Sequence, residues 1–466
     1  MTISRTVVDD ELLVFPVQDS WATIPADLRH EFLTRRTEST RPHRGQRTGG
    51  IRWEPLRPLI IEERAYRHLE TLAARLLHLA VDACCRRAST AGELYELLRF
   101  PHDLPLLDPD RPLVAAELTR YARPDLLIEQ GRPQFLELNN SNRLGGMAFS
   151  SRLAEAYAQL CPKSGLYSPP SAVTARFAAM ARRPRTDNGR DTSARALIPS
   201  YRATDRSRTV RLHRAKRATL DAVRRTGLDA VEADLADLRV GATGRLLAAG
   251  VPIDVVLLEW GGNRIRHDDG GLAALRAADR AGTVALFPRT ESALISSKAV
   301  LAWLHEDCEA GLLSPADEHL VRAHVPWTVC LGLNGDSSVP PNVLCKAAAE
   351  REQLIVKPAV DRAGKNVFFG RRASNDDWLP ALVRAAHKSP LVLQRRVEPD
   401  LVPMPFLDPD SRQQVTAQVP YVLSPFVIDG AAASVLVRHT TPGAPIRDVV
   451  IDTRLGARAN TVLLAP

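Results

Sequence analysis

The sequence lacks the features that mark membrane, secreted and zinc-binding proteins. No uncharged apolar run approaches the length that crosses a bilayer, and the opening residues MTISRTVVDDELL lack the basic and apolar segments of a secretory signal. The six cysteines show no CxxC spacing, which argues against a zinc site or a disulfide framework. We therefore expect a cytoplasmic protein with no membrane partner, in which the cysteines are buried as small apolar side chains.

Common catalytic motifs are missing as well. Neither HExxH nor GxSxG occurs, and no Ser/His/Asp arrangement can be recognised among the 12 histidines. There is also no Walker sequence, so a nucleotide site would have to be built without that phosphate loop. Covalent hydrolase chemistry is therefore not supported.

Aromatic residues make up only 5% of the chain, whereas the net charge is +8. A basic surface is the first requirement for binding nucleic acid, and much of the excess charge lies between Arg176 and Arg217. That stretch contains only two aromatic residues, Phe177 and Tyr201, and no recognisable nucleic-acid-binding motif. We therefore expect no nucleic-acid partner, and the arginines favour a solvated surface or a site for an anionic substrate.

The apolar and charged fractions, 45% and 25%, are ordinary for a soluble protein, and 466 residues leave room for two or three domains. Residues 1–60 are polar and interrupted by proline, which predicts an irregular N-terminal arm with a short helix over 26–34. Residues 61–181 contain three helical patterns and a hairpin. The stretch 182–193, rich in charge with Pro and Gly, predicts a linker.

Two further regions follow the predicted linker. Residues 194–290 alternate strands with a helix over 206–226, and the apolar run IDVVLLEW suits a sheet covered on both faces, so we expect a small parallel α/β domain. Residues 291–466 contain a helix over 376–387 and six predicted strands: 354–358, 367–370, 391–395, 421–428, 433–438 and 461–464. The chain as a whole is therefore expected to have a mixed α/β (α+β) fold with an inserted parallel domain.

The passage RPDLLIEQGRPQFLELNNSN predicts a hairpin of two extended runs joined around Gly131 and Pro133. A loop of three or five residues would pair position 125 with 137 and position 123 with 139. One face would then carry four polar side chains: Arg123, Asp125, Glu137 and Asn139. The other face would carry four apolar ones: Leu126, Ile128, Leu136 and Leu138.

The polar face of this predicted hairpin suits magnesium with bound phosphates, because Mg²⁺ prefers oxygen ligands and usually takes one or two carboxylates from the protein. The alternative is a hairpin whose polar side simply faces water, as half-exposed antiparallel strands often do.

Two lysines occupy positions suited to phosphate. LIVKPA places Lys357 within an apolar strand, where a phosphate could balance the ammonium; the alternative is an edge strand from which the lysine reaches solvent. Lys298 follows two serines at the start of the predicted helix SSKAVLAWL, where free backbone amides favour an anion, although surface lysines are common there. The polar stretch AGKN at 363–366 could close over a nucleotide through its backbone amides.

Two residues of the last third complete the set of candidates. Gln394 ends the predicted strand in LVLQRRVEP and leads into an acidic turn at Glu398, a position from which a polar side chain can face an adenine. Arg438 lies in the late strand VLVRHTT, where its guanidinium could bind phosphates or form a cross-strand ion pair.

In chain order, RPDLLIEQGRPQFLELNN, SSKAVLAWL, LIVKPAVDRAGKNVFFG, LVLQRRVEP and the strand with Arg438 resemble the ATP-grasp superfamily in its circularly permuted form, as in the synthetase part of glutathionylspermidine synthase. The resemblance covers about residues 115–465. It implies that 61–181 supplies the metal-binding hairpin and 291–466 the nucleotide-binding part of an ATP-grasp core. The amidase domain of that bifunctional enzyme has no counterpart here.

The resemblance also implies a role for each candidate. Magnesium would be bound by Asp125, Glu137 and Asn139, and Arg123 would hold the reacting carboxylate or its developing oxyanion. Four residues would contact ATP: Lys298 and Lys357 at its phosphates, Gln394 at the adenine, and Arg438 near the transferred phosphoryl group.

The activity that follows is ATP-dependent ligation of a carboxylate to an amine. ATP would phosphorylate the carboxylate, and an amine would attack the acylphosphate to form an amide. We expect ATP and Mg²⁺ as cofactors, and small molecules or short peptides as substrates. The alternatives are a catalytically inactive nucleotide-binding or scaffold protein that keeps the fold, and a basic nucleic-acid-binding protein.

Overall fold

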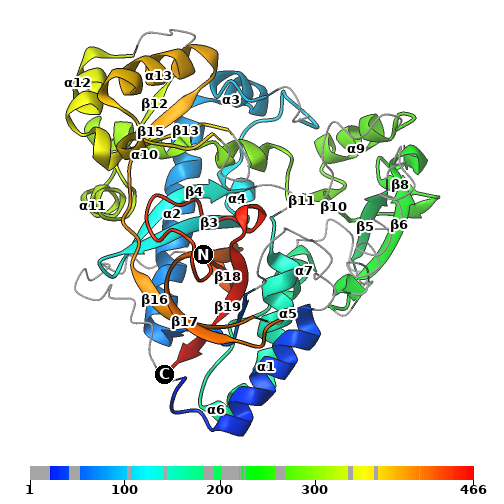
Figure 1. The fold of residues 1–466 in the computed structure, drawn as a ribbon. Helices are drawn as coiled ribbons and strands as arrows, with labels where there is room; N and C mark the ends of the chain where they lie inside the picture. The colour runs from blue at the N-terminus through cyan, green and yellow to red at the C-terminus, as the bar shows by residue number, and fades with distance from the viewer. Residues whose placement is uncertain are drawn as a thin grey trace.

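The structure is a computed structural model (Figure 1). It describes residues 21–40, 53–101, 106–140, 144–181, 194–200, 220, 222–224, 226–258, 268–333, 339–360, 366–408 and 410–466. The expected linker over 182–193 and most of the expected helix over 206–226 lie outside these residues, as does most of the AGKN stretch.

An eight-stranded sheet forms the centre of the molecule (Figure 1). Its main path runs β1 (Glu54–Pro55), β16 (Leu401–Leu407), β17 (Gln414–Ile428), β18 (Ala431–His439), β19 (Arg458–Ala465) and β2 (Leu59–Glu62). The two outer strands, β1 and β2, are close neighbours in the chain, so the sheet curls round on itself. The long strand β17 also pairs with β3 (Tyr121–Glu129), which pairs with β4 (Arg132–Asn139).

In the hairpin of β3 and β4, positions 123 and 125 pair with 139 and 137 as expected, but the turn and the register next to it differ from the prediction. The turn consists of two residues, Gln130 and Gly131, both in the left-handed region with φ of 52° and 75°, which is typical of tight hairpins. A bulge between Asp125 and Leu126 then shifts the register by one residue. The predicted loop of three or five residues was therefore wrong.

The bulge also changes which residue enters the core. Phe135 pairs with Leu126 and is fully buried, whereas Leu136 is only partly buried. The prediction that Leu136 lies on the apolar face with Leu126 was wrong, because the extra residue places Phe135 there instead. The other predicted members of that face, Ile128 and Leu138, are buried in the same core.

Helix α2 (Glu63–Arg87) packs along one face of the central sheet. Its apolar positions recur at helical spacing, and residues such as Leu69, Leu72 and Leu76 share a core with the sheet strands. The remaining helices of this part are α3 (Ala91–Leu97), α4 (Ala115–Leu118), α5 (Met147–Ala158), α6 (Cys161–Ser164), α7 (Ala172–Ala181), α10 (Ala299–Glu309) and α11 (Pro315–His324).

The short helix expected over 26–34 is confirmed and is longer than expected: α1 (Ala26–Thr40) buries Leu28 and Phe32 against α5. The rest of residues 1–60 was expected to be irregular, but β1 and β2 join the central sheet. These two strands pair with strands more than 100 positions away in the chain, so local composition does not reveal them.

A second sheet contains β11 (Ala285–Phe287), β10 (Val255–Leu257), β5 (Arg195–Ser200) and β6 (Asp229–Asp234), and all of its pairings are parallel. Helix α9 (Gly271–Arg280) packs on it through Leu275 and Ala278, and Phe177 of α7 belongs to the core that includes its Ile198 and Val255. A short antiparallel sheet, β7 (Leu238–Val240), β8 (Leu246–Ala248) and β9 (Val251–Pro252), lies beside α9.

A third sheet lies at the top of the molecule in Figure 1. Its order is β12 (Thr328–Leu331), β15 (Leu391–Arg395), β13 (Leu354–Pro358) and β14 (Phe368–Phe369). Helices α12 (Pro341–Ala349) and α13 (Asn375–Lys388) share a core with Leu354, Val356 and Leu393, so they cover one face of this sheet. Within the described ranges, no helix is both long and apolar enough to cross a membrane.

The position of Phe135 gives a test of this register. We expect Phe135→Ala to lower the free energy of unfolding by about 3–5 kcal/mol, because it empties a fully buried site, and Leu136→Ala to lower it by about 1 kcal/mol. Urea unfolding of the two variants measures the difference. An equal or larger loss for Leu136→Ala would show that the bulge is placed wrongly.

Candidate functional site

The four polar residues of the hairpin lie on one face. Arg123 pairs with Asn139 and Asp125 with Glu137 across β3 and β4, and the sheet buries Arg123 and Asp125 to 8% and 4% exposure. This is the arrangement that the sequence predicts. Because the face is covered, the interpretation of a polar side that simply faces water does not fit.

Asp125 is held between two guanidinium groups. Arg123 donates from Nε and Nη2 to its two carboxylate oxygens at 3.1 and 3.2 Å, and Nη2 of Arg438 lies 2.6 Å from Oδ2. Arg438 reaches Asp125 from β18 because β17 lies between β18 and β3, and it donates to the hydroxyl of Ser424 on β17 at 3.1 Å. The predicted phosphate ligand Arg438 therefore contacts a predicted metal ligand.

The charges around Asp125 determine its protonation. Burial alone would raise the pKa of this carboxyl, but Arg123 and Arg438 outweigh that effect and hold the pKa well below its usual range. Asp125 is therefore ionised at neutral pH. A third acid, Asp452, lies 3.7 Å from Arg438 Nη1 and extends the cluster towards the C-terminal segment.

Glu137 is paired with the first of the two lysines. Nζ of Lys298 lies 3.0 Å from Glu137 Oε2, and the side-chain amide of Asn139 donates to Oε1 at 3.2 Å. Lys298 stands at the start of α10, and its backbone N–H donates to the carbonyl of Ala359 at 2.8 Å. This hydrogen bond joins the start of α10 to Ala359, which lies two residues after Lys357 of the third sheet.

Lys357 lies on an interior strand, since β13 is flanked by β15 and β14. The alternative of an edge-strand lysine that reaches solvent is therefore wrong. Lys357 is 8% exposed, and its ammonium donates to Gln394 Oε1 at 2.7 Å, while Gln394 Nε2 donates to the hydroxyl of Thr328 at 2.9 Å. Gln394, predicted to face an adenine, thus orients Lys357 through its carbonyl oxygen.

Burial and the nearby charge of Lys298 lower the pKa of Lys357 to about 8, although Glu137 opposes the shift. The ammonium is thus mostly charged at neutral pH while its hydrogen-bond partner is a neutral amide. A buried ammonium of this kind gains most from an anion placed beside it.

Four contacts of the site could not be foreseen from the sequence. Three of them involve single polar side chains outside any sequence motif: Ser424, Asp452 and Thr328. In the fourth, the backbone carbonyl of Gly145 accepts from Arg123 Nη1 at 2.6 Å. No local pattern marks any of them, because each meets its partner through the sheet topology.

The candidate site contains more cationic side chains than carboxylates. Four cations (Arg123, Lys298, Lys357 and Arg438) meet three carboxylates (Asp125, Glu137 and Asp452). Among the described residues, no group of three or more His, Cys, Asp or Glu could hold a metal ion. Two carboxylates and an amide oxygen fit Mg²⁺ that arrives with phosphates, since this ion keeps few protein ligands.

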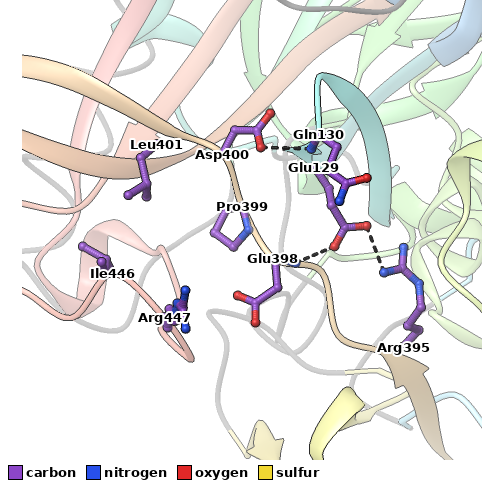
Figure 2. A pocket seen from close by; sticks show the side chains of 9 residues that line it. All are labelled: Glu129, Gln130, Arg395, Glu398, Pro399, Asp400, Leu401, Ile446 and Arg447. Atoms are coloured by element: carbon purple, nitrogen blue, oxygen red, sulfur yellow. Dashed lines mark hydrogen bonds and ion pairs between the residues drawn. The ribbon is translucent and has the colours of Figure 1, made fainter.

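A cavity of about 580 Å³ lies beside the segment that follows β15 (Figure 2). Asp400 accepts from the backbone N–H of Gln130 at 2.9 Å, and Glu129 accepts from the N–H of Glu398 at 2.6 Å, so this segment is tied to the hairpin turn. A second, more apolar cavity of about 610 Å³ lies between α13 and residues 445–455. None of the eight predicted residues lines either cavity.

No family model and no curated protein matches the sequence. Among solved structures, a glutathione synthetase-like effector from Globodera pallida matches with a TM-score of 0.53 and 12% identity, covering 96% of this chain and 98% of its own. D-alanyl-alanine synthetase A from Vibrio cholerae matches 58% of this chain and 74% of its own, with 12% identity and a TM-score of only 0.30. The first comparison, together with the sheets described above, shows a mixed α/β fold similar to that of the glutathione synthetase-like effector.

The lowered pKa of Lys357 gives a test by pH. Between about pH 8 and 10.5 the unfolded chain keeps a proton that the folded chain has lost at Lys357. The stability of the native chain relative to Lys357→Met should therefore rise with pH through this window, by on the order of 3 kcal/mol in total.

Urea unfolding at several pH values measures this difference. Lys388→Met, at an exposed position of α13, controls for the loss of one lysine. A stability difference between the native chain and Lys357→Met that does not change with pH would contradict the described environment of Lys357.

Proposed function

We propose that the chain is an ATP-dependent ligase that joins a carboxylate to an amine, with an ATP-grasp core in circularly permuted order like that of glutathionylspermidine synthase. The proposal rests on one observation: the polar face of the β3–β4 hairpin and the two predicted phosphate-binding lysines lie next to each other. The polar face of the β3–β4 hairpin contacts Lys298, and Lys298 neighbours Lys357, although the two lysines come from other elements.

The order of the residues along the chain supports the permuted arrangement. Asp125, Glu137 and Asn139 precede Lys298 and Lys357, so the metal-binding strands come before the nucleotide-binding ones. An acidic face followed by buried lysines offers opposite charges to the two parts of a magnesium nucleotide.

In this proposal, Asp125, Glu137 and Asn139 bind Mg²⁺, which neutralises charge on the ATP phosphates. Lys298 and Lys357 bind the phosphates directly, so Lys298 exchanges Glu137 for a phosphate oxygen when ATP enters. The excess of cations over carboxylates in the site favours entry of a polyanion over entry of a free divalent ion.

Arg123 and Arg438 act beside Asp125. Arg438 faces the transferred phosphoryl group, and Arg123 steadies the acyl oxygen of the carboxylate that receives it. The side-chain carbonyl oxygen of Gln394 holds Lys357 in place, and the adenine lies beyond Gln394. The phosphorylated carboxylate is then attacked by the amine, an amide forms and phosphate leaves.

The substrates in this proposal are small molecules or short peptides, and the reaction takes place in the cytoplasm without nucleic acid or membrane. The parallel sheet of residues 194–290 and the N-terminal residues shape the substrate pockets. The arginine-rich stretch between Arg176 and Arg217 favours an anionic substrate.

A second candidate is a nucleotide-binding or scaffold protein without activity. It is favoured by one observation, that the solved structure of similar fold is described as an effector. The two candidates differ in turnover, because only the ligase releases ADP when both a carboxylate and an amine are present.

Incubation of the purified chain with magnesium-ATP and pools of amino acids, polyamines and small peptides tests the proposal. We expect ADP release that requires one carboxylate and one amine, and a product whose mass is their sum less water. Glu137→Gln should lower turnover about 100-fold or more, because it removes a charged metal ligand. Glu318→Gln, at an exposed ion pair on α11, should leave it unchanged.

Full activity of Glu137→Gln would refute the metal assignment. Nucleotide binding without ADP release for any substrate pair would favour the inactive scaffold. Salt-dependent binding to DNA or RNA without ADP release would favour a nucleic-acid-binding protein.

A further inference from the structure

The cavity of about 610 Å³ between α13 and residues 445–455 has a largely apolar wall. Of the sixteen described residues that line it, three are charged and three are aromatic: Phe368, Phe369 and Trp378. Aromatic residues make up only 5% of the chain, so they are concentrated at this cavity. A cleft of this volume, with an apolar and aromatic wall and a few polar groups, is typical of sites that bind small organic molecules.

This cavity is separate from the candidate active site. Val356 of β13 lines it and packs in the core that β13 shares with α13, whereas the next residue, Lys357, points to the opposite face of the third sheet. Phe368 of β14 pairs directly with Val356, so its side chain lies on the same face as that of Val356. A ligand in this cavity would therefore not occupy the place of the two lysines.

Two large apolar side chains of the cavity wall are unusually exposed. Leu455 is 62% exposed and Phe368 is 59% exposed, the two highest values for large apolar side chains in the described part of the chain. Exposed apolar surface around a hollow indicates a binding site, because a ligand removes that surface from water. Trp378 is instead held in place, since its indole N–H donates to the carbonyl of Ala347 at 2.9 Å, so this part of the wall is already formed.

The three charged residues of the wall differ in their contacts. Asp448 forms an ion pair with Arg396 at 3.3 Å, and Asp377 accepts from a serine hydroxyl at the start of α13 at 2.6 Å. Both contacts that the structure shows for Arg372 are neutral: Nη2 donates to the carbonyl of Asp448 at 2.7 Å, and the guanidinium lies 5.4 Å from the ring centroid of Phe369. Arg372 is therefore the charge in the wall that an anionic ligand can neutralise.

We propose that this cavity binds a small organic molecule with a flat, apolar body and one carboxylate. The body packs against the aromatic part of the wall, and the carboxylate pairs with the guanidinium of Arg372. The ligand thereby joins α13 to residues 445–455, the segment whose Asp452 lies 3.7 Å from Arg438 in the candidate active site. The inference does not depend on the ligase proposal.

Fluorescence titration of the full chain with two probes tests the proposal. 8-Anilino-1-naphthalenesulfonate (ANS) carries a sulfonate in place of the carboxylate, and N-phenyl-1-naphthylamine (NPN) has the same aromatic body without an anionic group. We expect one molecule of either probe to bind per chain. Arg372→Gln should weaken ANS binding about fivefold and leave NPN binding unchanged, because only ANS pairs with the guanidinium. Arg371→Gln, at the exposed neighbouring position, should leave both unchanged.

Two further variants test the apolar wall. Phe368→Ser should weaken the binding of both probes about tenfold, because it removes apolar surface that they cover. Leu312→Ser, at a similarly exposed side chain outside the cavity, should leave binding unchanged. Ala381→Trp should block the cavity from α13, and Ala348→Trp, at an exposed alanine of α12 outside the cavity, is its matched control. Both Phe368 and Ala381 are exposed, so these variants should keep the fold, which thermal unfolding verifies.

No binding of either probe, or binding that survives both Phe368→Ser and Ala381→Trp, would overturn the proposal. Equal ANS affinities of Arg372→Gln and Arg371→Gln would refute the anionic group of the ligand. Displacement of ANS by a non-hydrolysable ATP analogue would assign the probe to the candidate active site instead. ANS binding that falls as the protein concentration rises, together with dimers in sedimentation, would assign the cavity to a second copy of the chain.

Discussion

The ion pairs of Asp125 are the interaction on which the rest of the site depends. One buried carboxylate accepts from Arg123 on its own strand and from Arg438 two strands away, with Ser424 between them. Burial would raise the pKa of this carboxyl, but the two guanidiniums outweigh that effect and hold the pKa well below its usual range. These contacts join the hairpin to the centre of the curled sheet, and the same hairpin carries Glu137 to Lys298. Ion pairs of Asp125 therefore join the first third of the chain to the last third.

The proposed function requires that a site with few carboxylates receive a magnesium nucleotide. Cations of the protein occupy the carboxylate oxygens that a metal ion would use, and Lys357 has only a neutral partner. In the proposed function, phosphates would draw the lysines away from these positions, and the carboxylates would then be free to hold Mg²⁺.

Much of this site could be predicted because its signals are local. Alternation along β3 and β4 gave the shared face of Arg123, Asp125, Glu137 and Asn139, and the flanking residues placed Lys357 in a strand and Lys298 at a helix start. The bulge after Asp125, the burial of Phe135 and the strands β1 and β2 could not be predicted, because distant partners determine them. The contact of Gln394 with Lys357 belongs to the same class, since it joins neighbouring strands far apart in sequence.

The proposed function requires that the hairpin face and the two lysines form one site for a magnesium nucleotide. Calorimetric titration of the native chain with a non-hydrolysable ATP analogue, in Mg²⁺ and in EDTA, measures this directly. We expect Mg²⁺ to strengthen binding, Glu137→Gln to lose this increment but retain the weaker binding seen in EDTA, and Lys357→Met to weaken binding under both conditions. Undiminished dependence on Mg²⁺ in Glu137→Gln, or no binding by the native chain, would contradict it.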